Sequence, residues 1–196
     1  MARIKTAFEI AMERVDDIDS DPEQIRKDSL KRQGKKIAGS FIFDPDKSIN
    51  DVKQVYEAIP EADRTTVKTA IVDTILANLS LPQNEEYVKS LGRLKVLMTV
   101  LTDSDKELLD AFVQIDNLYT QYLETREQMK DHLIEQYTPQ LKQKQQMLEE
   151  KTGQHFELKP EQDKEFVELL YQSYQRLDTQ FGQVLDQLRD LLRTLA

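Results

Sequence analysis

The sequence predicts an all-α protein, with an N-terminal bundle of short helices and a long antiparallel coiled-coil hairpin. Apolar residues recur three and four positions apart through most of the 196-residue chain, and strand-like alternation is rare. Apolar residues make up 39% of the chain and charged residues 32%, so the core must be thin, as it is among long, exposed helices. We expect the bundle in residues 1–101 and the hairpin in residues 102–196.

The N-terminal part of the bundle is predicted to contain two helices. The first spans residues 3–18, where apolar residues fall on one helix face. The second spans residues 22–36 and starts with Asp21 as its N-cap, followed by a proline in the first turn. The apolar residues 40–43 that follow are expected to be extended or buried.

Residues 22–43 form the one basic segment of an acidic chain. They carry 6 basic and 2 acidic residues, whereas the whole chain has a net charge of −9. The basic residues are Arg26, Lys27, Lys31, Arg32, Lys35 and Lys36. One interpretation is a site for nucleic acid or another anionic partner. The other, which the abundance of acidic residues favours, is a face that pairs with the acidic hairpin or with the N-terminal helix of the same protein.

Three further helices are predicted before the hairpin. Ser48 and Asp51 have the spacing of a helix N-cap and begin a short helix. Pro60 and Pro82 each begin another, because proline is favoured in the first turn of a helix. The apolar faces of these helices should close a small bundle in residues 48–101 against the first turns of the hairpin.

The two hairpin helices have clear start signals. Ser104 and Glu107 have the spacing of a capping box at the start of the first helix, and Pro160 begins the return helix. Apolar positions in the first helix alternate in steps of three and four, the spacing of a coiled-coil seam. Pro139 removes a backbone hydrogen bond and predicts a kink or break in that helix.

The position of the turn predicts which residues face each other across the hairpin. With the turn centred near residue 156, Met129 should lie near Val184. Arg126, the one polar residue on the seam of the first helix, should then lie near Asp186 and have a charged partner.

Two sets of apolar residues are candidates for binding other proteins. The tip of the hairpin carries Met147, Leu148, Phe156 and Leu158, and a polar shaft separates it from the root. One interpretation is that the hairpin acts as a lever or clasp, and the other is that the polar shaft is simply exposed to solvent. At the root, Leu109 and Leu192 lie beside the seam, where a third helix or a second subunit should cover them. The sequence therefore predicts a protein partner at the tip and a homodimer through the root.

The sequence lacks the patterns of common catalytic and cofactor sites. There is no Cys for thiolate chemistry and no glycine-rich phosphate loop. A helical di-iron site needs Glu three residues before His, but Met129 precedes His132 and Thr152 precedes His155 at that spacing. No stretch approaches the ~20 apolar residues of a membrane span. We expect no enzymatic activity, no cofactor, no metal and no membrane span.

The start of the chain resembles that of an uncharacterised family of bacterial all-helical proteins. The likeness covers about the first 40 residues and rests on the run Lys-Thr-Ala-Phe-Glu-Ile-Ala-Met-Glu-Arg at residues 5–14, with Gly34, Lys35 and Lys36 further on. The resemblance implies a cytoplasmic bacterial protein and carries over no functional residue. The residues themselves predict a non-enzymatic scaffold, adaptor or chaperone-like protein, with nucleic-acid or anionic-partner binding as the alternative.

Overall fold

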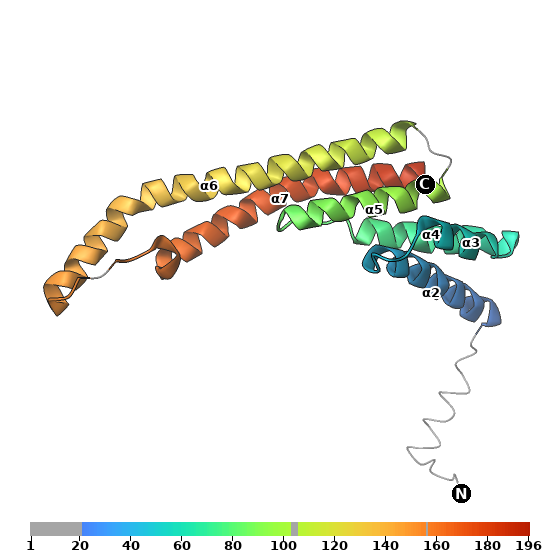
Figure 1. Ribbon diagram of the computed structural model, residues 1–196, viewed down its shortest axis with the longest axis horizontal. Coiled ribbons are helices and arrows are strands. Elements are labelled where there is room, and N and C mark those ends of the chain that lie inside the picture. The colour runs from blue at the N-terminus through green and yellow to red at the C-terminus, as the bar shows by residue number, and fades with distance from the viewer. Residues whose placement is uncertain (1–20, 103–105, 156) are drawn as a thin grey trace, which may run out of the picture.

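The computed structural model describes residues 21–102, 106–155 and 157–196, and within them all regular structure is helical. The all-α class is therefore confirmed. The expected helix over residues 3–18, the capping residue Ser104 and the tip residue Phe156 lie outside the described residues. In Figure 1 the long helix α6 lies over α7 and α5, with α4 below them and α2 outermost.

Helix α2 (Pro22–Phe43) is longer than predicted and includes the apolar residues at its end. Asp21 caps its first turn by accepting a hydrogen bond from the Glu23 amide at 3.0 Å. At the other end, Arg93 of α5 donates from Nε to the Phe41 carbonyl at 2.9 Å, and its guanidinium lies 4.3 Å from the centre of the Phe41 ring. The last turn is stable because Arg93 satisfies a carbonyl that the helix itself leaves free.

Helices α3 (Ile49–Glu57) and α4 (Glu61–Ala77) begin where the sequence predicts. The Asp51 amide donates to Ser48 Oγ at 3.2 Å, and the Ser48 amide donates to Asp51 Oδ2 at 3.0 Å, so the capping box is complete. Helix α5 (Glu85–Leu101) begins later than Pro82 because Asn84 accepts a hydrogen bond from the Tyr87 amide at 3.0 Å and acts as the N-cap.

Gly34 is the point at which α2 approaches α4 most tightly. A Cβ at this position would lie 2.7 Å from Ala70 Cβ and 2.7 Å from the Val67 carbonyl oxygen, closer than carbon atoms normally approach. Gly39, in the same helix, has no heavy atom within 4 Å of such a Cβ. One glycine of α2 is therefore required by packing, and the other is not.

Helix α6 (Lys106–Thr152) runs unbroken through Pro139 and curves in its distal part, so the proline bends the helix and does not end it (Figure 1). The return begins with a 3₁₀ turn, η1 (Pro160–Gln162), and helix α7 (Lys164–Leu195) starts four residues later than predicted. Asp163 is its N-cap and accepts from the Glu165 amide at 3.0 Å.

The predicted pairing of residues across α6 and α7 is wrong by about three helical turns. Arg126 lies 4.4 Å from the ring centre of Tyr174, far from the predicted partner Asp186 along α7. Helix α6 continues as far as Thr152, and the described residues between Gly153 and the 3₁₀ turn at Pro160 are not helical. An extended chain covers about 3.3 Å per residue, whereas a helix covers only about 1.5 Å. A non-helical segment therefore spans a given length of α6 with fewer residues than a helix would need.

Buried apolar side chains form two separate clusters. The main core joins α2, α3, α4 and α5 to the root of the hairpin and extends along α6 as far as Tyr119. A distal cluster contains only Tyr137, Leu141 and Phe166 as fully buried members. Residues 123–136 of α6 contribute no buried side chain between the two. The polar shaft was predicted at residues 136–146, but Tyr137 and Leu141 of that stretch are buried in the distal cluster, so the part of α6 without buried side chains lies before it.

Candidate functional site

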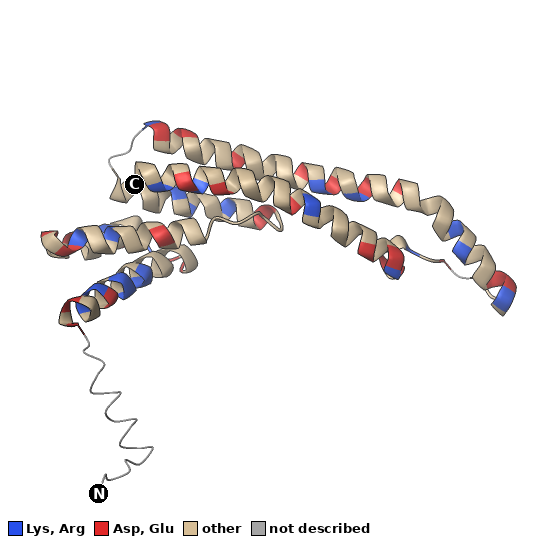
Figure 2. Cartoon of the chain, turned by 180° about the vertical axis from the view of Figure 1, so that it is seen from behind, with Lys and Arg blue, Asp and Glu red and all other residues tan. Residues whose placement is uncertain are grey.

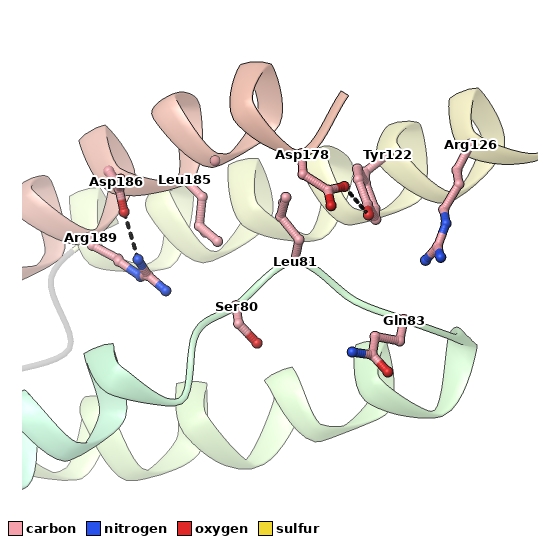
Figure 3. Close-up of a pocket in the computed structure, with 10 residues that line it drawn as sticks. Ser80, Leu81, Gln83, Tyr122, Arg126, Asp178, Leu185, Asp186 and Arg189 are labelled. Carbon is pink, nitrogen blue, oxygen red and sulfur yellow. Dashed lines mark hydrogen bonds and ion pairs between the residues drawn. The ribbon is translucent and has the colours of Figure 1, made fainter. Parts of the chain in front are cut away.

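A pocket lies where the loop between α4 and α5 meets α6 and α7 (Figure 3). Its volume is about 490 Å³. Three elements that are distant in the sequence form its walls, and most of the side chains are polar or charged. The lining residues are Ser80, Leu81, Gln83, Tyr122, Arg126, Asp178, Gly182, Leu185, Asp186 and Arg189.

The polar groups of this junction pocket connect its three walls. Tyr122 of α6 donates its hydroxyl hydrogen to Asp178 Oδ1 of α7 at 2.6 Å. Burial and the neighbouring Asp178 carboxylate raise the pKa of Tyr122 to about 12, so the phenol stays neutral near pH 7 and is a poor acid or base. Arg189 pairs with Asp186 at 2.6 Å and also donates to the Leu79 carbonyl at the end of α4.

These contacts explain what the junction does. All three link the hairpin to itself or to the loop after α4. The sequence analysis missed Tyr122, Asp178 and Arg189 because their pairing depends on how α6 and α7 align. The only signal was Arg126, a polar residue on an apolar seam; it stacks on the Tyr174 ring and lines the pocket at the end away from Arg189 (Figure 3).

The tip residues divide into two groups. Leu158 is half-buried and packs against the distal cluster, so it belongs to the hairpin's own structure. Met147 and Leu148 are 60% and 40% exposed on the last turns of α6. Phe156 lies outside the described residues. The exposed part of the predicted tip surface therefore consists of two adjacent apolar side chains near the end of a long helix.

The two root leucines differ in burial. Leu192 is completely buried within the main core of the same chain, because α7 packs there against the short-helix bundle. It is therefore not available to a second subunit. Leu109 is half-buried, and Val113, one turn further along α6, is 51% exposed. The accessible apolar surface at the root lies on the side of α6 that carries Leu109 and Val113.

A polar network closes the distal cluster. Lys144 Nζ lies 2.7 Å from Asp163 Oδ2 and 2.8 Å from Glu165 Oε2, and it donates to the Tyr137 hydroxyl at 2.8 Å. The hydrogen bonds to Asp163 and Glu165 raise the pKa of Lys144 above its ordinary value. The bond from Lys144 holds the pKa of Asp163 below its ordinary value. The network ties the end of α6 to the start of α7.

Replacing Lys144 with methionine should remove a pH-dependent part of the stability of the distal cluster. Asp163 has a lowered pKa in the folded protein, so its contribution is present above about pH 4 and is lost as the pH falls through its folded pKa. Lys144 has a raised pKa, so its contribution is present below about pH 10 and is lost as the pH rises through the folded value.

Hydrogen exchange of the amides around Tyr137 and Phe166, measured from pH 7 down to pH 3, checks this expectation. The wild type should lose protection as the pH falls, and Lys144→Met should begin less protected and change less. Lys142→Met, two residues away on exposed helix surface, is the control. Identical pH profiles for Lys144→Met and the wild type would contradict it.

Four of the six basic residues of α2 interact within the protein. Arg26 pairs with Asp63 of α4 at 2.9 Å, Lys27 pairs with Glu23 at 3.0 Å, and Lys31 lies 3.9 Å from Asp28. Arg32 donates to the Asp28 carbonyl at 3.3 Å. Lys35 and Lys36 form no ion pair with another described residue. Figure 2 shows the positions of Lys and Arg along the ribbon of α2 in blue. The pairs support intramolecular neutralisation more than a free anion-binding face, but the acidic partners lie on α2 and α4 and not, as was expected, on the hairpin.

The described residues show neither a metal-binding cluster nor a membrane-spanning helix. Residues 21–102, 106–155 and 157–196 contain no group of three or more His, Asp or Glu side chains placed to hold a metal ion. No helix within these ranges is both long and apolar enough to cross a membrane.

Comparison with known proteins identifies a family but no activity. A family model described as a family of unknown function, DUF6657, matches residues 53–194, from within α3 almost to the end of α7. This match confirms the expectation of an uncharacterised all-helical family, although the run at residues 5–14 lies outside it. No curated protein and no solved structure is significantly similar to the chain.

Proposed function

The chain belongs to DUF6657, a family of unknown function, and we propose that it is a non-enzymatic protein that binds other proteins, as a scaffold, an adaptor or a chaperone. The observation that carries this proposal is the exposure of Met147 and Leu148 near the end of α6. The two side chains are consecutive in the helix and leave it in different directions, and large apolar side chains left in water favour a partner that covers them. Methionine is especially suited to such a surface because its flexible side chain adapts to partners of different shape.

The shape of the hairpin supports the same proposal. Helix α6 has 47 residues and therefore extends about 70 Å. The main core holds one end of it, and the distal cluster and the Lys144 network hold the other. An apolar pair carried in this way stands well away from the main core. A partner can reach it without disturbing the bundle, which is what a scaffold or a clasp requires.

Replacing both Met147 and Leu148 with aspartate should weaken partner binding at least about tenfold, because two apolar contacts are lost and two charges are placed in their stead. For a chaperone, the measurement is the anisotropy of a labelled, permanently unfolded polypeptide titrated with the protein. For an adaptor, a photo-crosslinker at position 147 should capture one discrete protein in cells of the source organism.

The matched control is Gln143→Asp with Gln146→Asp, which adds the same charge to exposed positions of the same helix. Circular dichroism should show equal helix content in both double variants. The proposal fails if the wild type neither binds the unfolded polypeptide nor yields a discrete crosslink. It also fails if the variant at positions 147 and 148 binds as well as the control.

Self-association of the chain is the second part of this proposal. Because Leu192 is buried, the surface for a second copy has to lie elsewhere at the root of the hairpin.

A further inference from the structure

A groove between α5 and α6 forms a second apolar surface, at the opposite end of the hairpin from Met147. It is small, about 200 Å³, and its floor is apolar. The residues that line it are Val88, Leu91, Gly92, Lys95, Phe112, Val113 and Asp116.

The groove has room for an apolar side chain and presents one of its own. Gly92 faces open space, since no heavy atom lies within 4 Å of the position that a Cβ would take there. Val96, four residues further along α5, is 41% exposed, and Val113 on α6 is 51% exposed. Val88, Gly92 and Val96 follow one stripe of α5 at helical spacing, as Leu109 and Val113 do on α6. The surface therefore combines a hollow at a glycine with protruding valines.

The charges around the groove match each other. Lys95 and Asp116 both line it, and neither forms an ion pair with another described residue. A partner of strongly one-sided charge would be recognised by a groove of the opposite charge, but this groove carries one cation and one anion. A surface of this kind is complementary to itself. If a two-fold axis passes midway between the two side chains, Lys95 of each copy lies opposite Asp116 of the other copy.

We propose that this groove is the interface between two copies of the chain. Lys95 of each copy pairs with the partner subunit's Asp116, and Val113 packs over the partner subunit's Gly92. The balanced charges bring no net charge to the contact and so add nothing to the repulsion between two chains of net charge −9. The inference deepens the self-association proposed above, gives Leu109 a place at its edge, and is independent of partner binding at Met147 and Leu148.

Two charge reversals test the pairing. In Lys95→Glu, each copy places a carboxylate opposite the partner's Asp116. In Asp116→Lys, each copy places an ammonium opposite the partner's Lys95. Both variants should dissociate at least about tenfold more readily than the wild type in sedimentation velocity, because like charges face each other twice. An equimolar mixture of the two variants should dimerise again, since both contacts then join a carboxylate to an ammonium.

The mixture distinguishes this interface from any other. A stable heterodimer of the two variants, with neither forming a stable homodimer, supports the proposal. A wild type that stays at the monomer mass of 22.9 kDa at micromolar concentrations overturns it, as does a dimer that neither reversal weakens. A further outcome is that the chain dimerises, with the same response to the charge reversals, only after residues 1–20 are removed. That result would mean that residues 1–20 occupy the groove in the full chain, and it would also overturn the proposal.

Two controls keep the outcomes separate. Thermal unfolding of each variant should match that of the wild type, because Asp116 is exposed and the half-buried Lys95 forms no ion pair with another described residue. Binding of the unfolded polypeptide by the monomeric Lys95→Glu variant should be unchanged. Failure of the dimer therefore leaves the proposed partner binding standing, and failure of partner binding leaves the dimer standing.

Discussion

Replacing Phe166 with alanine should destabilise the distal end of the hairpin by about 3–5 kcal/mol and leave the main core folded. The Phe166 side chain is completely buried, and its ring centre lies 5.4 Å from that of Tyr137. With Tyr137 and Leu141 it makes up the whole buried part of the distal cluster. The loss should stay local because residues 123–136 of α6 bury no side chain that would couple the cluster to the main core.

Hydrogen exchange, resolved along the chain, measures this effect directly. Amides between residues 133 and 170 should exchange much faster in Phe166→Ala, and those of α4 and α5 should stay as protected as in the wild type. Val167→Ala is the matched control, since that side chain is 48% exposed and its loss should change stability by no more than about 0.5 kcal/mol. A uniform loss of protection along the whole chain would show that the two clusters unfold together.

Replacing Gly34 with alanine should lower the free energy of unfolding by about 1–3 kcal/mol, although alanine normally stabilises a helix interior. The new methyl carbon would lie 2.7 Å from both Ala70 Cβ and the Val67 carbonyl oxygen. One of these contacts is with the backbone of α4, which cannot move aside as a flexible side chain can. The helices must separate, and the buried residues Ile37 and Ile71 then lose part of their packing in the main core.

Gly39→Ala gives the comparison within the same helix. It introduces the same methyl group where nothing lies within 4 Å, so it should raise stability by up to about 1 kcal/mol. Urea denaturation followed by circular dichroism measures both changes. Shifts of the same sign for the two variants would mean that helix propensity, and not the contact between α2 and α4, decides the effect at Gly34.

Features decided by neighbouring residues could be predicted from the sequence. The helix start at Ser48 and Asp51 needs only residues three apart, and the structure contains both of its hydrogen bonds. The bend near Pro139 follows from the chemistry of one residue. Pro82 was a weaker signal, because Asn84 competes for the same helix start and its side chain bonds to the Tyr87 amide.

Features decided by distant residues could not be predicted. The alignment of α6 with α7 depends on how the chain turns between Gly153, which has a φ of 67°, and the 3₁₀ turn at Pro160. The wrong alignment hid the contact between Tyr122 and Asp178 and therefore the junction pocket. The partner of Arg26 is Asp63, 37 residues away. Neither pairing leaves a local pattern that a single sequence reveals.

The hydrogen bonds from Arg93 to the end of α2 limit where the chain can be truncated. The family match begins at residue 53, which suggests a convenient start for a shorter protein. Arg93, however, also donates to the Asp44 carbonyl at 2.8 Å, so a residue inside the matched region holds the chain outside it. Removing residues 1–52 would strand this guanidinium and uncover the side of α4 that faces Gly34. Helix α2 is therefore part of the folded unit, and a protein without it would expose apolar surface and tend to aggregate.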